Sequence, residues 1–273
     1  MFMPTALLTR SVVRVKNKFK RSLYWWDPAD GSINTGDYLS KVMVEKILET
    51  RDKKLSDKKS KQNRLFAIGS VLHYAKTGDC LWGTGRNGNM PDSHCTFDSL
   101  DVRAVRGPLT REFLLSRGID CPEVYGDPGI LTPWIYPKSL FLGASSHKEY
   151  RVVPHFMEDP AKFHGHGENI CLPNVSPARF ISMLVNSSLV ISSSLHGIIL
   201  AEAYGVPAVL LNAGHREKPF KYDDYYLGTG RSEYLTASSV EEALAMRPLA
   251  PPSGFADQQR ALLAAFPFDL WLD

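Results

Sequence analysis

SSLVISSSLHGIILAEAYGVPAVLL, residues 187–211, predicts a strand, a tight turn, a helix and a second strand. The apolar runs at 189–191 and 206–211 are typical of buried strands. Between them, residues 195–204 predict a helix that ends at Gly205. This order is a βαβ unit, which requires a parallel sheet covered by helices.

The start of that helix is the first candidate site. Ser193 or Ser194 is placed to cap the helix, and His196 falls in its first turn. The backbone N–H groups and the helix dipole favour an anion in front of such a start. They should also bias His196 toward its neutral form, so that it could pass protons near pH 7. The plainer alternative is a capped helix whose histidine bonds to a neighbouring strand, and spacing alone slightly favours it.

A second polar loop precedes a helix near the N-terminus. Tyr24-Trp25-Trp26 predicts a strand, and the turn-rich DPADGSINTGD follows it. Asp37 then opens a helix expected from Tyr38 to about residue 50. Loops of this kind bind ligands at the ends of strands in open α/β sheets. Asn34 and Asp37 could therefore line a cleft, or Asn34 could be only a turn former and Asp37 only an N-cap.

A glycine-rich loop, Gly83-Thr84-Gly85-Arg86-Asn87-Gly88, follows the predicted strand at 80–82. It matches the GxGxxG pattern of dinucleotide sites. The residues after it cannot begin an apolar-periodic helix, and no acidic residue ends a second strand about 20 positions on, so we reject a dinucleotide site. Gly85 and Arg86 remain candidates for contact with the phosphate or sugar of a ligand.

Two further candidates stand directly after predicted strands. Arg106 ends the strand predicted at 102–106, where a guanidinium can clamp a carboxylate or phosphate or pair with a nearby acid. His155 follows the strand at 151–153 and is the second catalytic candidate. Lys218 and Lys221 lie among aromatic residues, which suits either a sugar or phosphate rim or an ordinary amphipathic surface.

Composition limits the class of protein. The chain has 273 residues and a formal charge of +3, so its total charge does not suggest a nucleic-acid partner. Its four cysteines form no CxxC pair, which indicates a reducing compartment without a zinc site or disulfide frame. The two histidines of KFHGHGEN lack a third metal ligand, so we expect a loop there. With no run long enough for a membrane helix, we predict a soluble, cytoplasmic α/β protein without a resident metal.

The N-terminal segment 10–21, RSVVRVKNKFKR, is strongly basic. It could be a peripheral arm attracted to anionic lipid on the inner face of the plasma membrane. The alternative, which we favour, is a solvated leader segment.

The strands and helices divide into two α/β halves. We predict domains at 1–137 and 138–273, with a fifth strand of a doubly wound first half at 123–125. A strand at 140–142 opens the second half. A helix at 258–266 could cross back onto the first domain.

The serine-histidine segment resembles the signature block of the polysaccharide pyruvyl transferase family, most of all its shorter bacterial exopolysaccharide branch. Other blocks agree in order over roughly residues 24–227. They are Asn34-Thr35-Gly36-Asp37-Tyr38-Leu39, Ile68-Gly69-Ser70, Leu81-Trp82-Gly83-Thr84-Gly85, Arg106-Gly107-Pro108-Leu109-Thr110, Gly126-Asp127-Pro128-Gly129-Ile130-Leu131 and Val153-Pro154-His155.

The resemblance implies two Rossmann-like domains that face a central cleft, as in glycosyltransferase-B-like proteins. It implies transfer of pyruvate from phosphoenolpyruvate to a sugar of a polysaccharide or lipid-linked oligosaccharide, as a cyclic ketal, without redox cofactor or metal. His196 would be the main acid and base, and His155 its partner or a phosphate ligand. Arg106 and the amides near Ser193 and Ser194 would hold the anion.

One position departs from the family pattern. Many relatives have arginine where this chain has Ser194, so the usual phosphate contact is in doubt. Arg86, Arg216, Lys218 or Lys221 could replace it. Two rival functions remain: a sugar-nucleotide-dependent glycosyltransferase and a non-catalytic protein of polysaccharide assembly.

Overall fold

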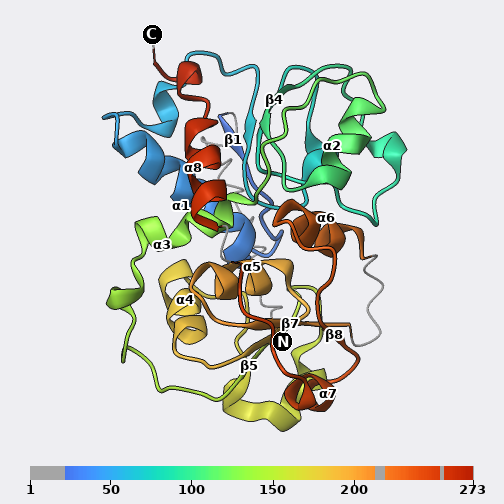
Figure 1. Ribbon diagram of the computed structural model, residues 1–273. Helices are drawn as coiled ribbons and strands as arrows, with labels where there is room; N and C mark the ends of the chain where they lie inside the picture. The colour runs from blue at the N-terminus through green and yellow to red at the C-terminus, as the bar shows by residue number, and fades with distance from the viewer. Residues whose placement is uncertain (1–21, 213–218, 253–254, 273) are drawn as a thin grey trace, which may run out of the picture.

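The computed structural model describes residues 22–212, 219–252 and 255–272, and it contains two four-stranded parallel sheets. The first joins, in chain order, β1 (Leu23–Tyr24), β2 (Leu65–Phe66), β3 (Cys80–Trp82) and β4 (Asp101–Ala104). The second joins β5 (Arg151–Val153), β6 (Val190–Ser192), β7 (Ala208–Leu211) and β8 (Thr236–Ala237). The predicted α/β class is confirmed, and the two sheets form two lobes (Figure 1).

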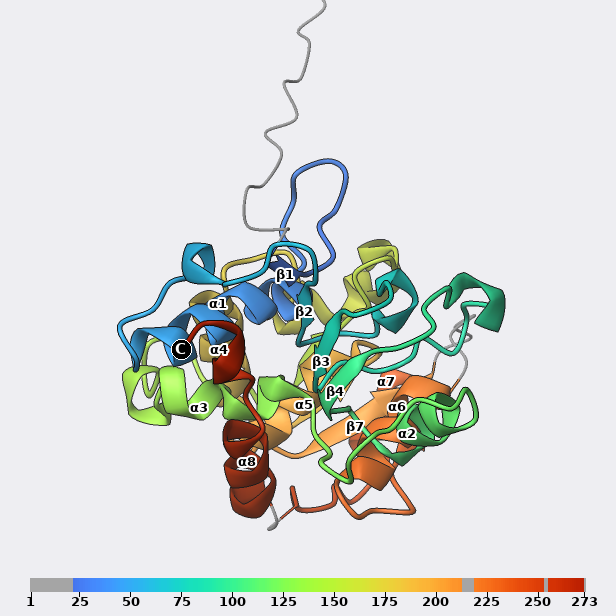
Figure 2. The ribbon, with the colours of Figure 1, turned by 90° about the horizontal axis from the view of Figure 1, so that it is seen from above.

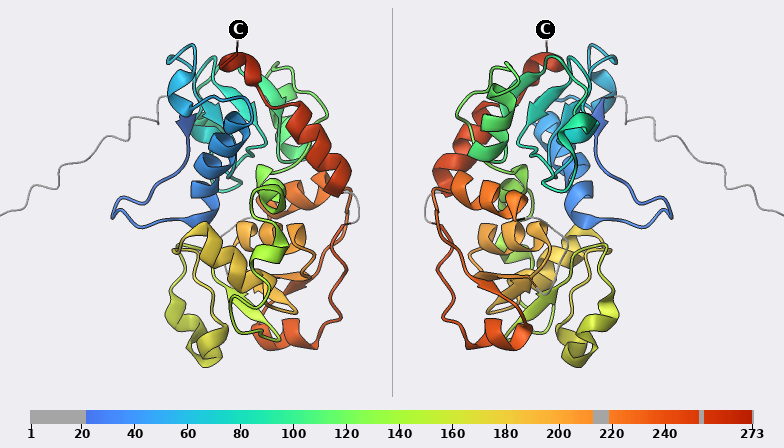
Figure 3. Two further views of the ribbon diagram at one scale, coloured as in Figure 1. Left: turned by 90° about the vertical axis from the view of Figure 1, so that its left-hand side faces the viewer. Right: turned by 90° about the vertical axis from the view of Figure 1, so that its right-hand side faces the viewer.

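Helices cover both sheets and fill the space between them (Figures 1 and 3). The α-helices are α1 (Thr35–Glu49), α2 (Pro108–Leu115), α3 (Thr132–Ile135), α4 (Pro177–Val185), α5 (Leu195–Ala203), α6 (Phe220–Gly228), α7 (Val240–Ala245) and α8 (Phe255–Ala264). Short 3₁₀ helices are η2 (Leu55–Asp57), η3 (Leu72–Tyr74), η4 (Asp92–His94), η5 (Pro128–Leu131), η6 (Lys138–Leu140), η7 (Pro160–Asn169) and η8 (Phe268–Leu270). The predicted βαβ unit is thus β6, α5 and β7.

Alternation along each short strand gives the first sheet two buried faces. Leu65 and Trp82 face the cluster that contains residues of α1 and α8, whereas Phe66 and Leu81 face the cluster that contains Leu114 of α2. Figure 2 shows these helices on opposite sides of the sheet. Both faces are apolar because a parallel sheet is covered on both sides.

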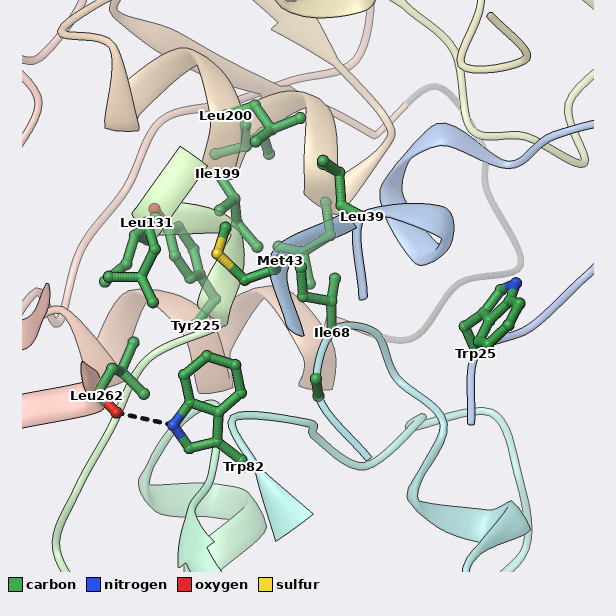
Figure 4. Packing of buried hydrophobic residues seen from close by; sticks show 14 of the residues in the cluster. Trp25, Leu39, Met43, Ile68, Trp82, Leu131, Ile199, Leu200, Tyr225 and Leu262 are labelled. Carbon is green, nitrogen blue, oxygen red and sulfur yellow. Dashed lines mark hydrogen bonds between the residues drawn. The ribbon is translucent and has the colours of Figure 1, made fainter. Parts of the chain in front are cut away.

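One large apolar cluster connects the two lobes. It includes Met43 of α1, Leu131 of η5, Ile199 of α5 and Tyr225 of α6 (Figure 4). The starts of α1 and α5 are therefore held against each other by a shared core rather than by surface contacts.

The C-terminal helix returns to the first sheet, as predicted. Trp82 of β3 donates its indole N–H to the backbone oxygen of Leu262 in α8, at 2.8 Å (Figure 4). The predicted domain boundary after residue 137 stays a prediction, since the strands fall on either side of it but α8 does not.

Three local predictions differ from the structure. Instead of a strand at 123–125, Tyr125 makes one isolated bridge to Val105, and the described strands of both sheets run in chain order without the reversal of a doubly wound sheet. Residues 140–142 are not a strand: Leu140 ends the 3₁₀ helix η6, Phe141 is buried and Leu142 is exposed. Helix α1 begins before Asp37, so its N-cap is Asn34.

Candidate active site

A cavity of about 460 Å³ lies where the carboxyl ends of strands from both sheets meet. Residues that follow β1, β2, β3, β5 and β6 line it, together with residues at the starts of α1, α5 and α6. Open parallel sheets bind ligands at this edge. The lining residues are Trp26, Asn34, Asp37, Ser70, Val71, His73, Tyr74, Asn87, Met90, His155, Phe156, Met157, Ser194, Leu195, His196 and Lys221.

His196 lines the cavity from the first turn of α5, where the sequence placed it. Its side chain is 14% exposed, so the imidazole is enclosed but reachable. The first turn of α1 approaches so closely that a methyl group on Gly36 would overlap the ring. The Asn-Thr-Gly-Asp block and the signature block therefore meet at this imidazole, and the meeting requires a glycine.

Asp127 is the nearest acidic partner of His196. The Nε2 atom of His196 lies 3.7 Å from Oδ2 of Asp127, too long for a hydrogen bond but close enough for an ion pair. Oδ1 accepts a hydrogen bond from the backbone N–H of Gly129 at 2.8 Å, at the start of η5. Both Nε2 and Oδ2 are buried without a hydrogen-bond partner among the described residues.

The pKa of His196 shifts in the direction opposite to the prediction. Burial lowers the pKa of its imidazole, but the adjacent Asp127 and the charge of Asp37 outweigh burial, so the pKa lies above the ordinary value. The expected neutral bias is therefore wrong. The sequence argument counted the helix dipole but not the carboxylates that tertiary structure brings to the ring.

Asp37 and Asn34 both line the cavity, as one of the two interpretations expected. The Asn34 side chain donates to Oδ2 of Asp37 at 2.7 Å. Burial raises the pKa of Asp37 to about 6, partly offset by the charges of His196 and Lys221, while Asp127 raises it further. Asp37 is therefore a carboxyl group that titrates close to neutral pH.

Ser194 is the N-cap of α5 and lines the cavity. Its side chain makes no cap hydrogen bond to any described residue, and its own N–H donates to Oγ of Ser192 at 3.0 Å. The first-turn amides of α5 have no intrahelical acceptors, as at every helix start. Ser193 does not line the cavity. It is fully buried.

His155 lines the cavity from the loop after β5. Its backbone N–H donates to Oγ of Ser193 at 2.9 Å and to Oε2 of Glu158 at 3.1 Å. Ser193 also donates to Glu158 at 2.5 Å. Ser193 therefore has a positioning role, because it connects the loop of His155 to the turn between β6 and α5.

Lys221 brings the ammonium group of the site. It is 6% exposed, lines the cavity from the first turn of α6 and lies 5.1 Å from the centre of the Tyr222 ring. Its charge opposes protonation of both Asp37 and His196. Lys218, which the sequence grouped with it, lies outside the described residues, as do Arg216 and the basic segment 10–21.

Arg106 is not among the described residues that line the cavity. It is fully buried, and its Nε lies 3.0 Å from Oδ2 of Asp224. The remaining nitrogens donate to Oγ of Ser70 at 2.6 Å and to the backbone oxygen of Arg86 at 2.8 Å. The ion-pair alternative is thus the correct one. Gly85 makes room for it, since a methyl group there would overlap the guanidinium.

Arg86 also stays outside the described cavity wall. Its guanidinium pairs with Asp92 and lies over the rings of Phe113 and Phe220, at 4.6 and 5.1 Å from their centres. Gly85 and Arg86 therefore do not line the cavity, and the guanidinium of Arg86 does not face a ligand there.

Sequence reasoning overlooked several site residues. Asp127 stands in one of the family blocks but is given no role from the sequence, and Glu158 belongs to no motif. The half-buried aromatic pair Trp26 and Phe156 was not singled out either, because Trp26 is part of a predicted strand and Phe156 belongs to no motif. The available signal was position, since each residue follows a predicted strand or its loop.

The described residues hold neither a candidate metal cluster nor a helix suited to crossing a membrane. Residues 22–212, 219–252 and 255–272 hold no group of three or more histidine, cysteine, aspartate or glutamate side chains that could bind a metal ion. Within the same ranges, no helix combines the length and hydrophobicity that crossing a bilayer requires.

Comparison with known proteins gives a family match, two relatives and a distant structural match. Residues 34–215 match the model of a family described as polysaccharide pyruvyl transferase. The succinoglycan biosynthesis protein ExoV of Rhizobium meliloti (strain 1021) is 28% identical over 236 residues, which are 81% of this chain and 70% of that protein. The uncharacterized protein L143 of Acanthamoeba polyphaga mimivirus is 24% identical over 216 residues, 74% of each chain.

A solved structure of the wall teichoic acid polymerase TagF resembles the fold distantly. The TM-score is 0.36 at 12% identity, and the match covers 78% of this chain and 63% of the other. The family match spans the cavity residues from Asn34 to His196 and confirms the resemblance seen in the sequence, including its exopolysaccharide branch.

Proposed function

The chain belongs to the polysaccharide pyruvyl transferase family, and from that premise we propose that it transfers pyruvate from phosphoenolpyruvate to a sugar of an exopolysaccharide precursor, as a cyclic ketal. The observation that carries the proposal is the imidazole of His196, enclosed at the wall of a cavity between two carboxylates and a helix start. We propose a glycosyltransferase-B-like arrangement of two Rossmann-like lobes around this cavity.

The reaction defines which groups are needed. Phosphoenolpyruvate is the phosphate ester of an enol, so protonation of its methylene carbon leaves a cation at C2. One sugar hydroxyl attacks C2 and loses its proton. A second hydroxyl of the same sugar then displaces inorganic phosphate and closes the ketal. The site must supply an acid, a base and donors for the phosphate and carboxylate.

His196 and Asp37 suit the acid and the base. The raised pKa of His196 favours its protonated form, which could give the methylene carbon its proton. Asp37 has a pKa of about 6, so its carboxylate can accept the proton of an attacking hydroxyl near neutral pH. Both pKa values are raised by their surroundings, and shifts set by environment are how active sites assign acid and base roles. Asp127 acts through His196 and is a positioning residue.

The anionic donor would lie against Lys221, the Ser194 hydroxyl and the first amides of α5. Lys221, which lines the same cavity, would supply the charge that many relatives provide through arginine at position 194. His155, on the same cavity wall, would contact the phosphate or the acceptor hydroxyl. The acceptor would be a lipid-linked oligosaccharide on the cytoplasmic side of the membrane.

The test is incubation with phosphoenolpyruvate and a panel of lipid-linked oligosaccharides. We expect release of inorganic phosphate and a mass gain equal to pyruvate less water. His196→Ala should lower the rate by about 10²- to 10⁴-fold, the usual contribution of a general acid.

The matched control is His164→Ala, because His164 is exposed and outside the described cavity wall. Full activity of His196→Ala would contradict the catalytic role. Consumption of a sugar nucleotide instead of phosphoenolpyruvate would identify a glycosyltransferase. Unchanged ketal formation in cells that carry only the His196→Ala variant would identify an assembly protein.

A further inference from the structure

We propose that the mouth of the cavity is a binding site for a neutral sugar ring, held against Trp26 and Phe156. This inference rests on the proposed function and assigns the acceptor to a place in the same cavity. Both rings line the cavity and are half-buried.

The two rings come from different sheets. Trp26 follows β1 of the first sheet and Phe156 follows β5 of the second. Their ring centres are 5.6 Å apart with an interplanar angle of 80°, an edge-to-face contact. In such a pair the ring that offers its edge keeps both faces uncovered by its partner. A sugar can lay its apolar C–H face on an uncovered ring and direct its hydroxyls toward the cavity.

The surrounding residues continue the same surface. Tyr74 is 40% exposed and Met157 is 75% exposed, and both line the cavity. Large apolar side chains gathered at the edge of a polar cavity mark a ligand site more often than an ordinary surface. The side-chain amide of Asn87 is also on the wall and can bond a hydroxyl.

Charge separates the two ends of the cavity. Asp37, His196 and Lys221 are nearly buried and form its charged interior. Of the described lining residues, Lys221 alone carries an ammonium or guanidinium group, and it belongs to that interior. The mouth therefore suits an uncharged pyranose and not the pyrophosphate of a lipid carrier, while the interior suits the anionic donor.

The experiment is calorimetric titration of the full chain, without donor, with cellotetraose, laminaritetraose and galactotetraose. We expect at least one of them to bind. Trp26→Ala and Phe156→Ala should each weaken that binding about three- to tenfold, the size of a stacked aromatic contact. Trp26→Phe should retain most of the affinity, and phosphoenolpyruvate should bind all of these variants equally.

Trp134→Ala is the control, because Trp134 is 49% exposed and is not on the described cavity wall. The proposal is overturned if no neutral oligosaccharide binds, if Trp134→Ala weakens binding as much as Trp26→Ala, or if geranyl pyrophosphate is the ligand that depends on Trp26. Sugar binding that depends on Trp26, without any pyruvate transfer, would contradict the proposed function but support this sugar site.

Discussion

Two buried ion pairs in this protein differ in how many hydrogen bonds their charged atoms make. Arg106 and Asp224 are both 0% exposed and 3.0 Å apart. Asp224 also accepts from the backbone N–H of Thr110 at 2.9 Å and from its hydroxyl at 2.6 Å, and Arg106 donates to Ser70 and Arg86. This pair connects the segment after β4 with α6, and neither side chain is on the described cavity wall.

The pair of His196 and Asp127 is incomplete. Nε2 of His196 and Oδ2 of Asp127 are 3.7 Å apart. Neither atom forms a hydrogen bond with any described residue. Buried polar atoms are normally hydrogen-bonded, so exceptions beside a cavity indicate where a substrate completes the network. The comparison teaches that burial and charge alone do not identify a site, because Arg106 has both and serves the fold.

Breaking the complete pair should have the largest effect on stability. Asp224→Ala leaves the buried guanidinium of Arg106 without its counter-charge. Loss of one partner of a buried pair lowers the free energy of unfolding by about 3–5 kcal/mol. Denaturant unfolding followed by circular dichroism measures this loss.

The control for that measurement is Asp269→Ala, since Asp269 pairs with Arg103 at 2.8 Å but is 60% exposed. An exposed pair contributes only about 0.2–1 kcal/mol. Equal losses in the two variants would show that the junction at Arg106 is not the structural tie inferred from its partners.

At the site of His196, removing a charge should raise the free energy of unfolding instead of lowering it. Burial raises the pKa of Asp37 from 3.8 to about 6, so the folded chain binds a proton that the unfolded chain has lost between these values. Stability should therefore fall as pH rises from about 4 to 6. Asp37→Asn removes this penalty and should raise the free energy of unfolding above pH 6 by up to about 3 kcal/mol. Its activity should be lost.

Unfolding curves of the wild type and Asp37→Asn at pH 4 and pH 7.5 provide the measurement, with exposed Asp98→Asn as the matched control. The gain should be present at pH 7.5 and nearly absent at pH 4. A variant that is less stable than the wild type at both values would mean that Asp37 supports the fold rather than the reaction.

The sequence was sufficient for the elements on which the site is built. Capping serines, a β-branched strand and a terminating glycine predicted β6, α5 and β7, and they placed His196 in a first helical turn. The turn residues before α1 likewise brought Asn34 and Asp37 to the correct edge of a sheet. These features are local, so spacing alone determines them.

Side-chain partners could not be predicted, because they depend on contacts between distant segments. The charge of His196 is set by Asp127 and Asp37, which lie 69 and 159 positions before it. Arg106 likewise meets Asp224 across 118 positions. Spacing gives the end of the strand at which a residue stands, but not whether its side chain faces the cavity or the junction between lobes.

The smallest effect expected is on the incomplete pair itself. Asp127→Asn retains an oxygen that can accept from the Gly129 N–H but removes the charge beside His196. Without that charge the pKa of His196 falls, so a smaller fraction of it is protonated on the alkaline side of the pH profile. We expect kcat/KM for phosphoenolpyruvate to fall about tenfold there, less than for His196→Ala, because the imidazole itself remains.

The pH profile distinguishes a positioning role from a structural one. The alkaline limb of kcat/KM reports the acid of the free enzyme, so it should move to lower pH in Asp127→Asn, and the rate should recover toward that of the wild type as pH is lowered. A rate that fell by the same factor at every pH would place Asp127 with Asp224, as part of the fold. A shifted limb would place it with His196, because only a group whose charge sustains the proton on that imidazole can move it.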